Sequence, residues 1–254
     1  MLKYSEAGKG KAVVLVHAFP LSSKMWEGQV RLLSGFARVI TPEIPGLGGS
    51  PRQAVPSIPE TAARLAELLD KLGVREPVMI GGLSMGGYVT FEFLRQFPQR
   101  VCGLGLFATR ANADGPEILE RRKKTIEKIE KEGLEAFLPG VLANLLGETT
   151  RRSNPALVEH VRRLVLENPA EGVTDATRAM AARRDSQDLL AGIQCPVLVI
   201  GGAEDTFVTG EETTAMQKRI PGSELHLFEK TGHLVNLEAP EKFNALLEKF
   251  VKSL

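Results

Sequence analysis

The stretch that decides the fold is VMIGGLSMGGYVTFEFLRQF, residues 78–97. Its apolar opening predicts a buried strand over 78–80, and the spacing of apolar side chains predicts a helix over 86–97. Between them stands Gly82-Leu83-Ser84-Met85-Gly86, the Gly-x-Ser-x-Gly pattern of a nucleophile elbow. Glycine two residues before and two after the serine lets the strand and helix backbones approach closely. We therefore predict that Ser84 lies on a strained turn with its hydroxyl exposed.

This pentapeptide is not decisive alone, because a plain glycine-rich connection between a strand and a helix has the same composition. Further parts of a hydrolytic site have to follow it in the chain. In folds built on this elbow, the acid and then the histidine come after the serine.

Short apolar runs and helical spacing alternate on both sides of the motif. Strands are predicted over 12–16, 38–41, 101–107, 197–200 and 225–228, and helices over 61–72, 211–220 and 240–251. This alternation predicts an α/β fold with a mostly parallel central sheet flanked by helices.

The alternation stops between Arg110 and Leu190, where the chain becomes charged and helical. We predict a helical cap, residues 110–190, inserted into a core formed by residues 1–109 and 191–254. Helix breaks are expected at Gly133, Pro139, Asn154-Pro155 and Asn168-Pro169. Candidates for the cleft wall are Phe137, Leu138, Leu142 and Met180, although for any single one of them a place in the core of the cap is the favoured interpretation.

Composition narrows the kind of partner. The chain has 254 residues, 43% of them hydrophobic and 25% charged, with a net charge of +1, so no field of one sign is available for nucleic acid or an anionic membrane. The basic run Arg121–Lys124 is interspersed with glutamates and is expected to be a solvated helix face. A small-molecule substrate is expected, and neither a monomer nor a homo-oligomer is favoured.

The apolar runs and the cysteines of the sequence predict the location of the protein and the redox state of its thiols. The first residues lack the apolar region of a secretory signal, and no apolar run is long enough to cross a bilayer, so a cytoplasmic protein is expected. The two cysteines, Cys102 and Cys195, lack metal-ligand spacing and are expected to be reduced, buried thiols. No metal or organic cofactor is expected.

A serine hydroxyl needs a histidine to remove its proton. Of four histidines, His233 follows the last predicted strand and can reach the carboxyl edge of the sheet. His226 lies inside that strand, His160 lies in the predicted cap, and His17 is expected to brace the loop after the strand 12–16. Position therefore selects His233, and activity should fall as the pH drops through about 6 to 7, where histidine becomes protonated.

The histidine in turn needs a carboxylate. Asp205 follows the strand 197–200 at the edge where ligands bind in open α/β sheets, and Glu204 is its neighbouring rival. Backbone N–H groups that face the oxyanion are expected at Met85, next to the serine, and at Phe19, in the loop after the strand 12–16. The predicted catalytic set is thus Ser84, Asp205 and His233.

With these residues, the motifs His17–Leu21, Gly82–Tyr88 and Gly232–Leu234 resemble bacterial carboxylesterases of the α/β-hydrolase fold and their relatives, the 3-oxoadipate enol-lactonases. The resemblance spans nearly the whole chain. It implies an acyl-enzyme mechanism on small ester or lactone substrates. C–C bond hydrolases and perhydrolases use the same triad and remain alternatives. A non-catalytic ligand receptor is disfavoured, because a protein without catalysis has no need to keep nucleophile, base and acid together.

Two positions depart from that group. Ala18 stands where glycine is usual, so the oxyanion loop would differ if that position required a backbone conformation open only to glycine. Residues 44–48 lack an arginine that the group often carries, so any contact of that arginine with a substrate carboxylate would be absent. The absence of that arginine favours a serine carboxylesterase (a carboxylic ester hydrolase) acting on short esters over an enol-lactonase.

Overall fold

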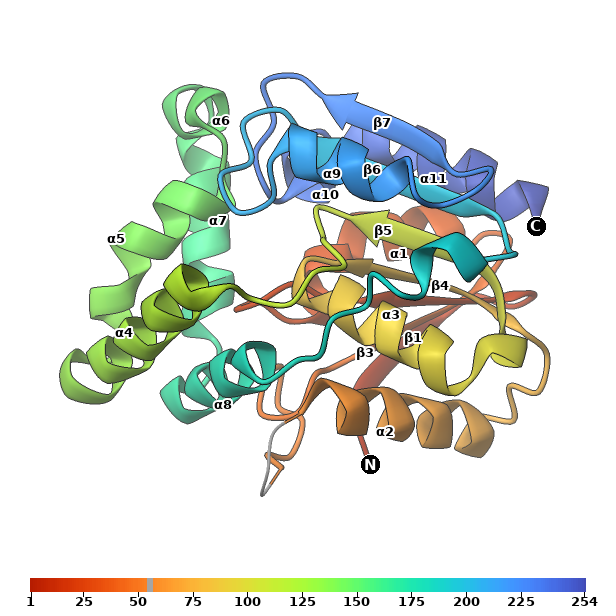
Figure 1. The fold of residues 1–254 in the computed structure, drawn as a ribbon, viewed down its shortest axis with the longest axis horizontal. Coiled ribbons are helices and arrows are strands. Elements are labelled where there is room, and N and C mark those ends of the chain that lie inside the picture. Colours follow the sequence, from red (N-terminus) through yellow and green to blue (C-terminus); the bar gives the residue numbers. More distant parts are fainter. Residues whose placement is uncertain (54–56) are drawn as a thin grey trace.

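The computed structural model describes residues 1–53 and 57–254 (Figure 1). The strands there are β1 (Tyr4–Ala7), β2 (Ala12–Val16), β3 (Arg38–Pro42), β4 (Val78–Leu83), β5 (Val101–Phe107), β6 (Val197–Gly202) and β7 (Glu224–Phe228). The α-helices are α1 (Glu27–Leu33), α2 (Ile58–Lys71), α3 (Met85–Gln96), α4 (Pro116–Glu132), α5 (Leu134–Leu145), α6 (Glu148–Ser153), α7 (Pro155–Leu166), α8 (Ala170–Ala181), α9 (Gly210–Gln217), α10 (Val235–Glu238) and α11 (Pro240–Ser253). Short 3-10 helices span Ser23–Trp26, Pro98–Arg100 and Leu190–Gly192.

The strands form one sheet in the order β1-β3-β2-β4-β5-β6-β7. Strand β1 is antiparallel to β3, and all other neighbours are parallel. Every residue of β2, β4 and β6 is buried, which explains their continuous apolar sequences. Each predicted strand is present, whereas β1, with the polar sequence YSEA, had no apolar run to reveal it.

Helices cover both faces of the sheet, with α2 against α3 on one face and α1 against α11 on the other (Figure 1). The rings of Trp26, Phe107 and Phe243 pack together with centroids 4.8–6.3 Å apart and join α11 to the sheet. The helices predicted beside the elbow and at the C-terminus are found at α3 and α11. The prediction of an α/β fold with a mostly parallel sheet is confirmed.

Helices α4 to α8 lie between β5 and β6 in the chain, and Figure 1 shows α4 to α7 gathered to one side of the core. Their junctions coincide with the expected breaks at Gly133, 154–155 and 168–169. The break expected at Pro139 is wrong, because this residue lies within α5. It is the sixth of the twelve residues of this helix, where it removes only the N–H that would donate to the Glu135 carbonyl, and the helix continues to Leu145.

Two further expectations concern membrane-spanning helices and the two cysteines. None of the helices in 1–53 and 57–254 is long and apolar enough to cross a membrane. Cys102 and Cys195 are free, but both are only partly buried, so the expectation of buried thiols is wrong in degree. Burial raises the pKa of each thiol above its ordinary value.

Candidate active site

Ser84 occupies the turn between β4 and α3 in a strained backbone conformation. Its φ is 54° and its ψ is −113°, a region that residues with a side chain rarely adopt. The turn is held because Ser84 N–H donates to the Phe107 carbonyl at 2.9 Å and Thr109 Oγ1 donates to the Ser84 carbonyl at 2.9 Å. These bonds fix the backbone on both sides of the hydroxyl.

The glycines of the motif are required by the close approach of the backbones. A Cβ on Gly82 would lie 2.1 Å from the Gly86 carbonyl carbon, and a Cβ on Gly86 would lie 2.1 Å from the Val16 carbonyl oxygen. Neither neighbour is a movable side chain. The strand-to-helix turn that the sequence predicted around Ser84 is therefore present, and glycine at both positions is what allows it to close.

His233 and Asp205 form a buried pair at the same edge of the sheet. His233 Nδ1 lies 2.7 Å from Asp205 Oδ2, and the residues are 1% and 4% exposed. The other carboxylate oxygen, Oδ1, accepts from the N–H groups of Phe207 at 2.8 Å and Val208 at 3.0 Å. Because Nδ1 donates to a carboxylate that these amides hold in place, Nε2 of the neutral ring keeps its lone pair.

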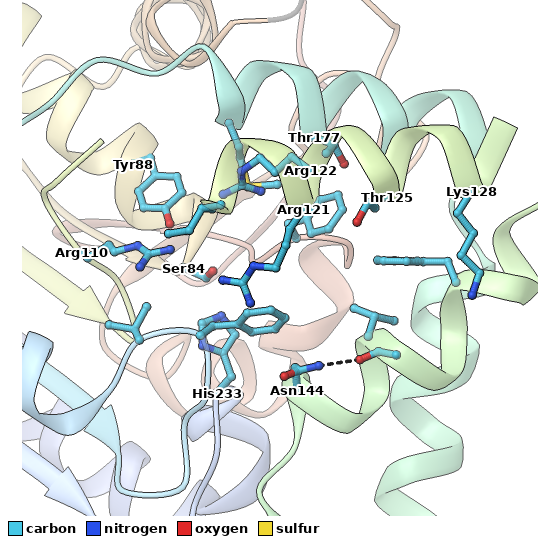
Figure 2. Close-up of a pocket in the computed structure, with 18 residues that line it drawn as sticks. Ser84, Tyr88, Arg110, Arg121, Arg122, Thr125, Lys128, Asn144, Thr177 and His233 are labelled. Carbon is cyan, nitrogen blue, oxygen red and sulfur yellow. Dashed lines mark hydrogen bonds between the residues drawn. The ribbon is translucent and has the colours of Figure 1, made fainter. Parts of the chain in front are cut away.

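Ser84 and His233 line the same cavity, of about 330 Å³ (Figure 2). The ring of Phe207 packs edge-on against His233, with centroids 5.1 Å apart. Phe137 and Met180 also line the cavity, as two of the predicted wall residues, whereas Leu138 is buried in the core. The wall predicted from the α4 to α8 region is therefore correct in part.

Glu204, the rival acid, is engaged elsewhere. Its carboxylate accepts from Thr149 N at 2.8 Å and from Thr149 Oγ1 at 2.5 Å, at the start of α6. The hydrogen bond from Thr149 lowers the pKa of Glu204 below its ordinary value. Of the two adjacent carboxylates, the structure brings Asp205 to His233 and Glu204 to the α4 to α8 region.

His17 braces its loop, as the sequence predicted. Its Nε2 accepts the Ile44 N–H at 3.0 Å, so Nδ1 carries the proton and donates to the Ala18 carbonyl at 3.0 Å. Full burial lowers the pKa of His17, against an opposing effect of Glu43. Among the described non-glycine residues, positive φ occurs at Ser84, Ala108 and Lys230. Alanine at position 18 therefore needs no glycine-only conformation.

Sequence reasoning missed Glu238, which holds the loop on both sides of His233. Its Oε2 accepts from Gly232 N at 3.0 Å and from Gly147 N at 2.8 Å, and its Oε1 accepts from Leu234 N at 3.1 Å. Gly147 lies between α5 and α6, so one carboxylate joins that region to the histidine loop. No local pattern points to this role, because it depends on a contact between residues 91 positions apart.

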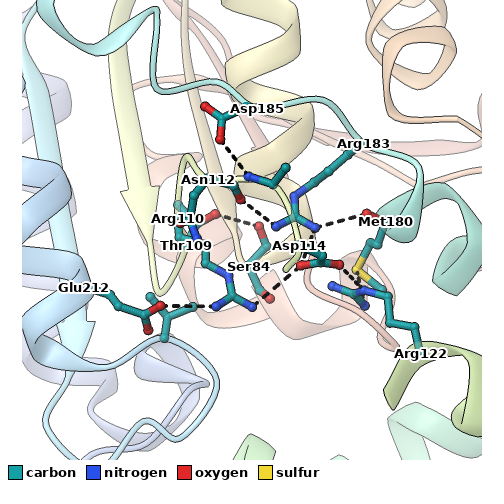
Figure 3. Close-up of polar contacts among 12 residues, drawn as sticks. Ser84, Thr109, Arg110, Asn112, Asp114, Arg122, Met180, Arg183, Asp185 and Glu212 are labelled. Atoms are coloured by element: carbon teal, nitrogen blue, oxygen red, sulfur yellow. Dashed lines mark hydrogen bonds and ion pairs between the residues drawn. The ribbon is translucent and has the colours of Figure 1, made fainter. Parts of the chain in front are cut away.

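Arginines gather around a second carboxylate beside the cavity (Figure 3). The side chain of Asp114 is fully buried and pairs with Arg122 and, at 2.7 Å, with Arg183, while Arg110 lies 3.8 Å away. Burial alone would raise the pKa of Asp114, but the hydrogen bond and charge of Arg122, together with the charge of Arg183, outweigh it and lower the pKa. The Arg110 guanidinium also pairs with Glu212 at 3.3 Å.

The solvated face expected for the run Arg121–Lys124 is confirmed for Arg121, Lys123 and Lys124, which are exposed, whereas Arg122 is partly buried. Arg121 and Arg122 line the cavity with Ser84, as do Thr125 and Lys128 further along α4 (Figure 2). Positions three, four and seven apart share one face of a helix, so Arg121, Thr125 and Lys128 follow one another along the cavity, and Arg121 and Lys128 also remain exposed to solvent. Within the described chain, no cluster of three histidine, cysteine or acidic side chains could hold a metal ion.

A serine on a strained elbow and a histidine paired with a buried aspartate, at the carboxyl edge of a parallel sheet, define a hydrolase-type α/β domain. The family model described as alpha/beta hydrolase fold matches residues 11–240. The chain belongs to the α/β-hydrolase fold family, which confirms the resemblance noted from its motifs.

Relatives within this family include esterases and enol-lactonases. The 3-oxoadipate enol-lactonase 1 of Acinetobacter baylyi is 26% identical over 243 residues, which cover 96% of this chain and 89% of that protein. A thermophilic esterase from Thermogutta terrifontis, solved with malate bound, is 38% identical with a TM-score of 0.95, covering 99% of this chain and 93% of that one. The enol-lactonase from Burkholderia xenovorans is 25% identical with a TM-score of 0.91, covering 99% and 96%. This chain is a hydrolase of the same fold.

Proposed function

We propose that the protein is a carboxylic ester hydrolase that uses Ser84 as nucleophile, His233 as general base and Asp205 as the acid that orients the histidine. The observation that carries this proposal is the 2.7 Å contact between His233 Nδ1 and Asp205 Oδ2, because it leaves Nε2 free in the cavity that Ser84 also lines. A carboxylate that orients the base and stabilises the imidazolium is what this chemistry requires.

In the proposed cycle, Ser84 Oγ attacks the ester carbonyl while His233 Nε2 takes its proton. The backbone N–H groups of Phe19 and Met85 donate to the oxyanion that forms. Met85 is the first residue of α3, so its N–H has no intrahelical acceptor and the positive end of the helix dipole faces the same point. The alcohol leaves with the proton from His233, and water then releases the acid from Ser84 by the same steps.

Residues 110–190 are proposed to act as a cap that sets substrate size. Support comes from Phe137 and Met180, which reach the cavity from this region, and from Glu204 and Glu238, which hold α6 and the Gly147 turn against the core. A cavity of about 330 Å³ suits a small, short-chain ester.

A 3-oxoadipate enol-lactonase, or a related lactonase, is the second candidate. It is supported by the Acinetobacter baylyi relative, which aligns with 96% of this chain. The same residues would serve, with the difference that the leaving enol stays attached to the acyl group.

The test is hydrolysis of p-nitrophenyl esters from acetate to decanoate, beside an enol-lactone, by wild type and Ser84→Ala. We expect the wild type to turn over short esters and Ser84→Ala to lose up to about 10⁶ in rate. Ser5→Ala, on the exposed edge strand β1, is the matched control and should retain wild-type activity. Turnover of the lactone alone would favour the lactonase, and turnover of neither substrate would refute the proposal.

A further inference from the structure

The cavity at Ser84 has an unbalanced charge. Its lining includes Arg110, Arg121, Arg122 and Lys128 and, within the described chain, no aspartate or glutamate. The whole sequence carries a net charge of only +1, so the excess is a property of this wall of the cavity and not of the protein as a whole.

Two of these cations already have partners outside the cavity. Arg110 pairs with Glu212 and Asp114, and Arg122 pairs with Asp114 (Figure 3). Their charges are therefore largely neutralised by Asp114 and Glu212, and these pairs hold the wall of the cavity in place.

Arg121 and Lys128 differ, because no ion pair joins either of them to any carboxylate in residues 1–53 and 57–254. They stand seven residues apart on α4 with Thr125 between them, so all three project from one face of the helix. Figure 2 shows the Arg121 guanidinium pointing into the cavity toward the space between Ser84 and His233, with Lys128 at the far end.

The rest of the wall offers these charges no anionic partner. Phe19, Phe137, Val141 and Phe207 surround the same space, and the polar side chains that share it, such as Thr125 and Asn144, are neutral. An anion in this space would gain charge-assisted hydrogen bonds from Arg121 that the neutral lining cannot match. A carboxylate is the anion that a planar guanidinium binds best among the groups of a small ester.

We infer that Arg121 binds a free carboxylate on the acyl chain of the substrate, so that the preferred substrates are monoesters of dicarboxylic acids. The inference rests on the proposed ester hydrolysis at Ser84 and adds the substrate class. Arg121 would hold the carboxylate of a short acyl chain, and Lys128, further from Ser84, would meet that of a longer one.

Three pairs of substrates of matched shape test the inference. Monoethyl succinate, glutarate and adipate are compared with ethyl butanoate, pentanoate and hexanoate, in which a methyl group replaces the carboxylate. Hydrolysis is followed by product chromatography for wild type, Arg121→Gln and Lys123→Gln. Lys123 belongs to the same helix and has the same charge, but it lies outside the cavity lining, so it controls for the general field.

For the best pair, we expect Arg121→Gln to lower the ratio of kcat/KM for the monoester to that for the neutral ester by roughly 10- to 100-fold, mainly through KM, as for loss of a charge-assisted hydrogen bond. Lys123→Gln should leave the ratio within about 2-fold, since an exposed charge outside the site is well screened. An unchanged ratio in Arg121→Gln, or an equal fall in both variants, would overturn the inference.

A binding measurement separates failure of this inference from failure of the proposed function. Calorimetric titration of glutarate into Ser84→Ala is repeated with Ser84→Ala/Arg121→Gln. If wild type hydrolyses no ester, the proposed function fails. Weaker glutarate binding in the double variant would still support the carboxylate site, whereas no binding to Ser84→Ala, or equal binding to both variants, would refute it.

Discussion

Replacing Glu238 with glutamine is expected to loosen the loop that carries His233. The wild-type carboxylate accepts three backbone N–H groups, two at Oε2 and one at Oε1. The best glutamine rotamer keeps its oxygen at the Oε2 position, so the Gly147 and Gly232 bonds remain but lose their charge assistance. Its amide nitrogen then faces the Leu234 N–H, which still has the Leu145 carbonyl at 3.2 Å as an acceptor.

The size of the effect follows from these contacts. A hydrogen bond to a charged group contributes about 1 kcal/mol more than a neutral one, so two weakened bonds reduce the free energy of unfolding by about 2 kcal/mol. For a chain of this length, that corresponds to a fall in Tm of about 4–8 °C. Glu238→Ala, which leaves the Gly147 and Gly232 N–H groups without an acceptor, should lose about 4 kcal/mol.

Calorimetry and ester kinetics measure the two consequences. We expect kcat of Glu238→Gln to fall about 10-fold, because His233 lies between two of the residues that the carboxylate holds and small displacements of a base are costly. Glu229→Gln, an exposed change of the same kind in the same loop, is the control. If both variants melt within about 1 °C of wild type, or if kcat of Glu238→Gln is unchanged, the role assigned to Glu238 is wrong.

The remaining predictions concern charge and pH. Asp114→Asn leaves buried arginines without their counter-ion, so the free energy of unfolding measured in urea should fall by about 3 kcal/mol at neutral pH. The control is Asp70→Asn, which breaks half-exposed ion pairs and should lower the free energy of unfolding by less than about 1 kcal/mol. Because the folded protein lowers the pKa of Asp114, its contribution is present above about pH 4 and is lost as the pH falls through the lowered value; a difference between wild type and Asp114→Asn that stays constant down to about pH 2 would contradict this. For activity, kcat/KM should decline at acidic pH, since a general base has to be unprotonated to accept the Ser84 proton, and a flat profile would count against the assigned base.

What the sequence by itself determined lies in local patterns. Continuous apolar runs identified the buried strands, because a strand covered on both faces has no polar side. The glycines at 82 and 86 identified the turn at Ser84, because only a residue without Cβ fits between the backbones there. Position relative to the strands was enough to select His233 and to limit the acid to Asp205 or its neighbour Glu204.

Tertiary structure decided whatever depends on contacts between distant segments. Glu204 and Asp205 are adjacent and alike in sequence, and only the folded loops turn one toward Thr149 and the other toward His233. Likewise, the run Arg121–Lys124 has the sequence of a charged helix surface, and only the packing of α4 shows that Arg121, although exposed, and Arg122 also line the cavity. A helix period shows which side chains share a face, but what that face contacts is determined by the rest of the chain, since packing energy belongs to pairs of elements and not to either element alone.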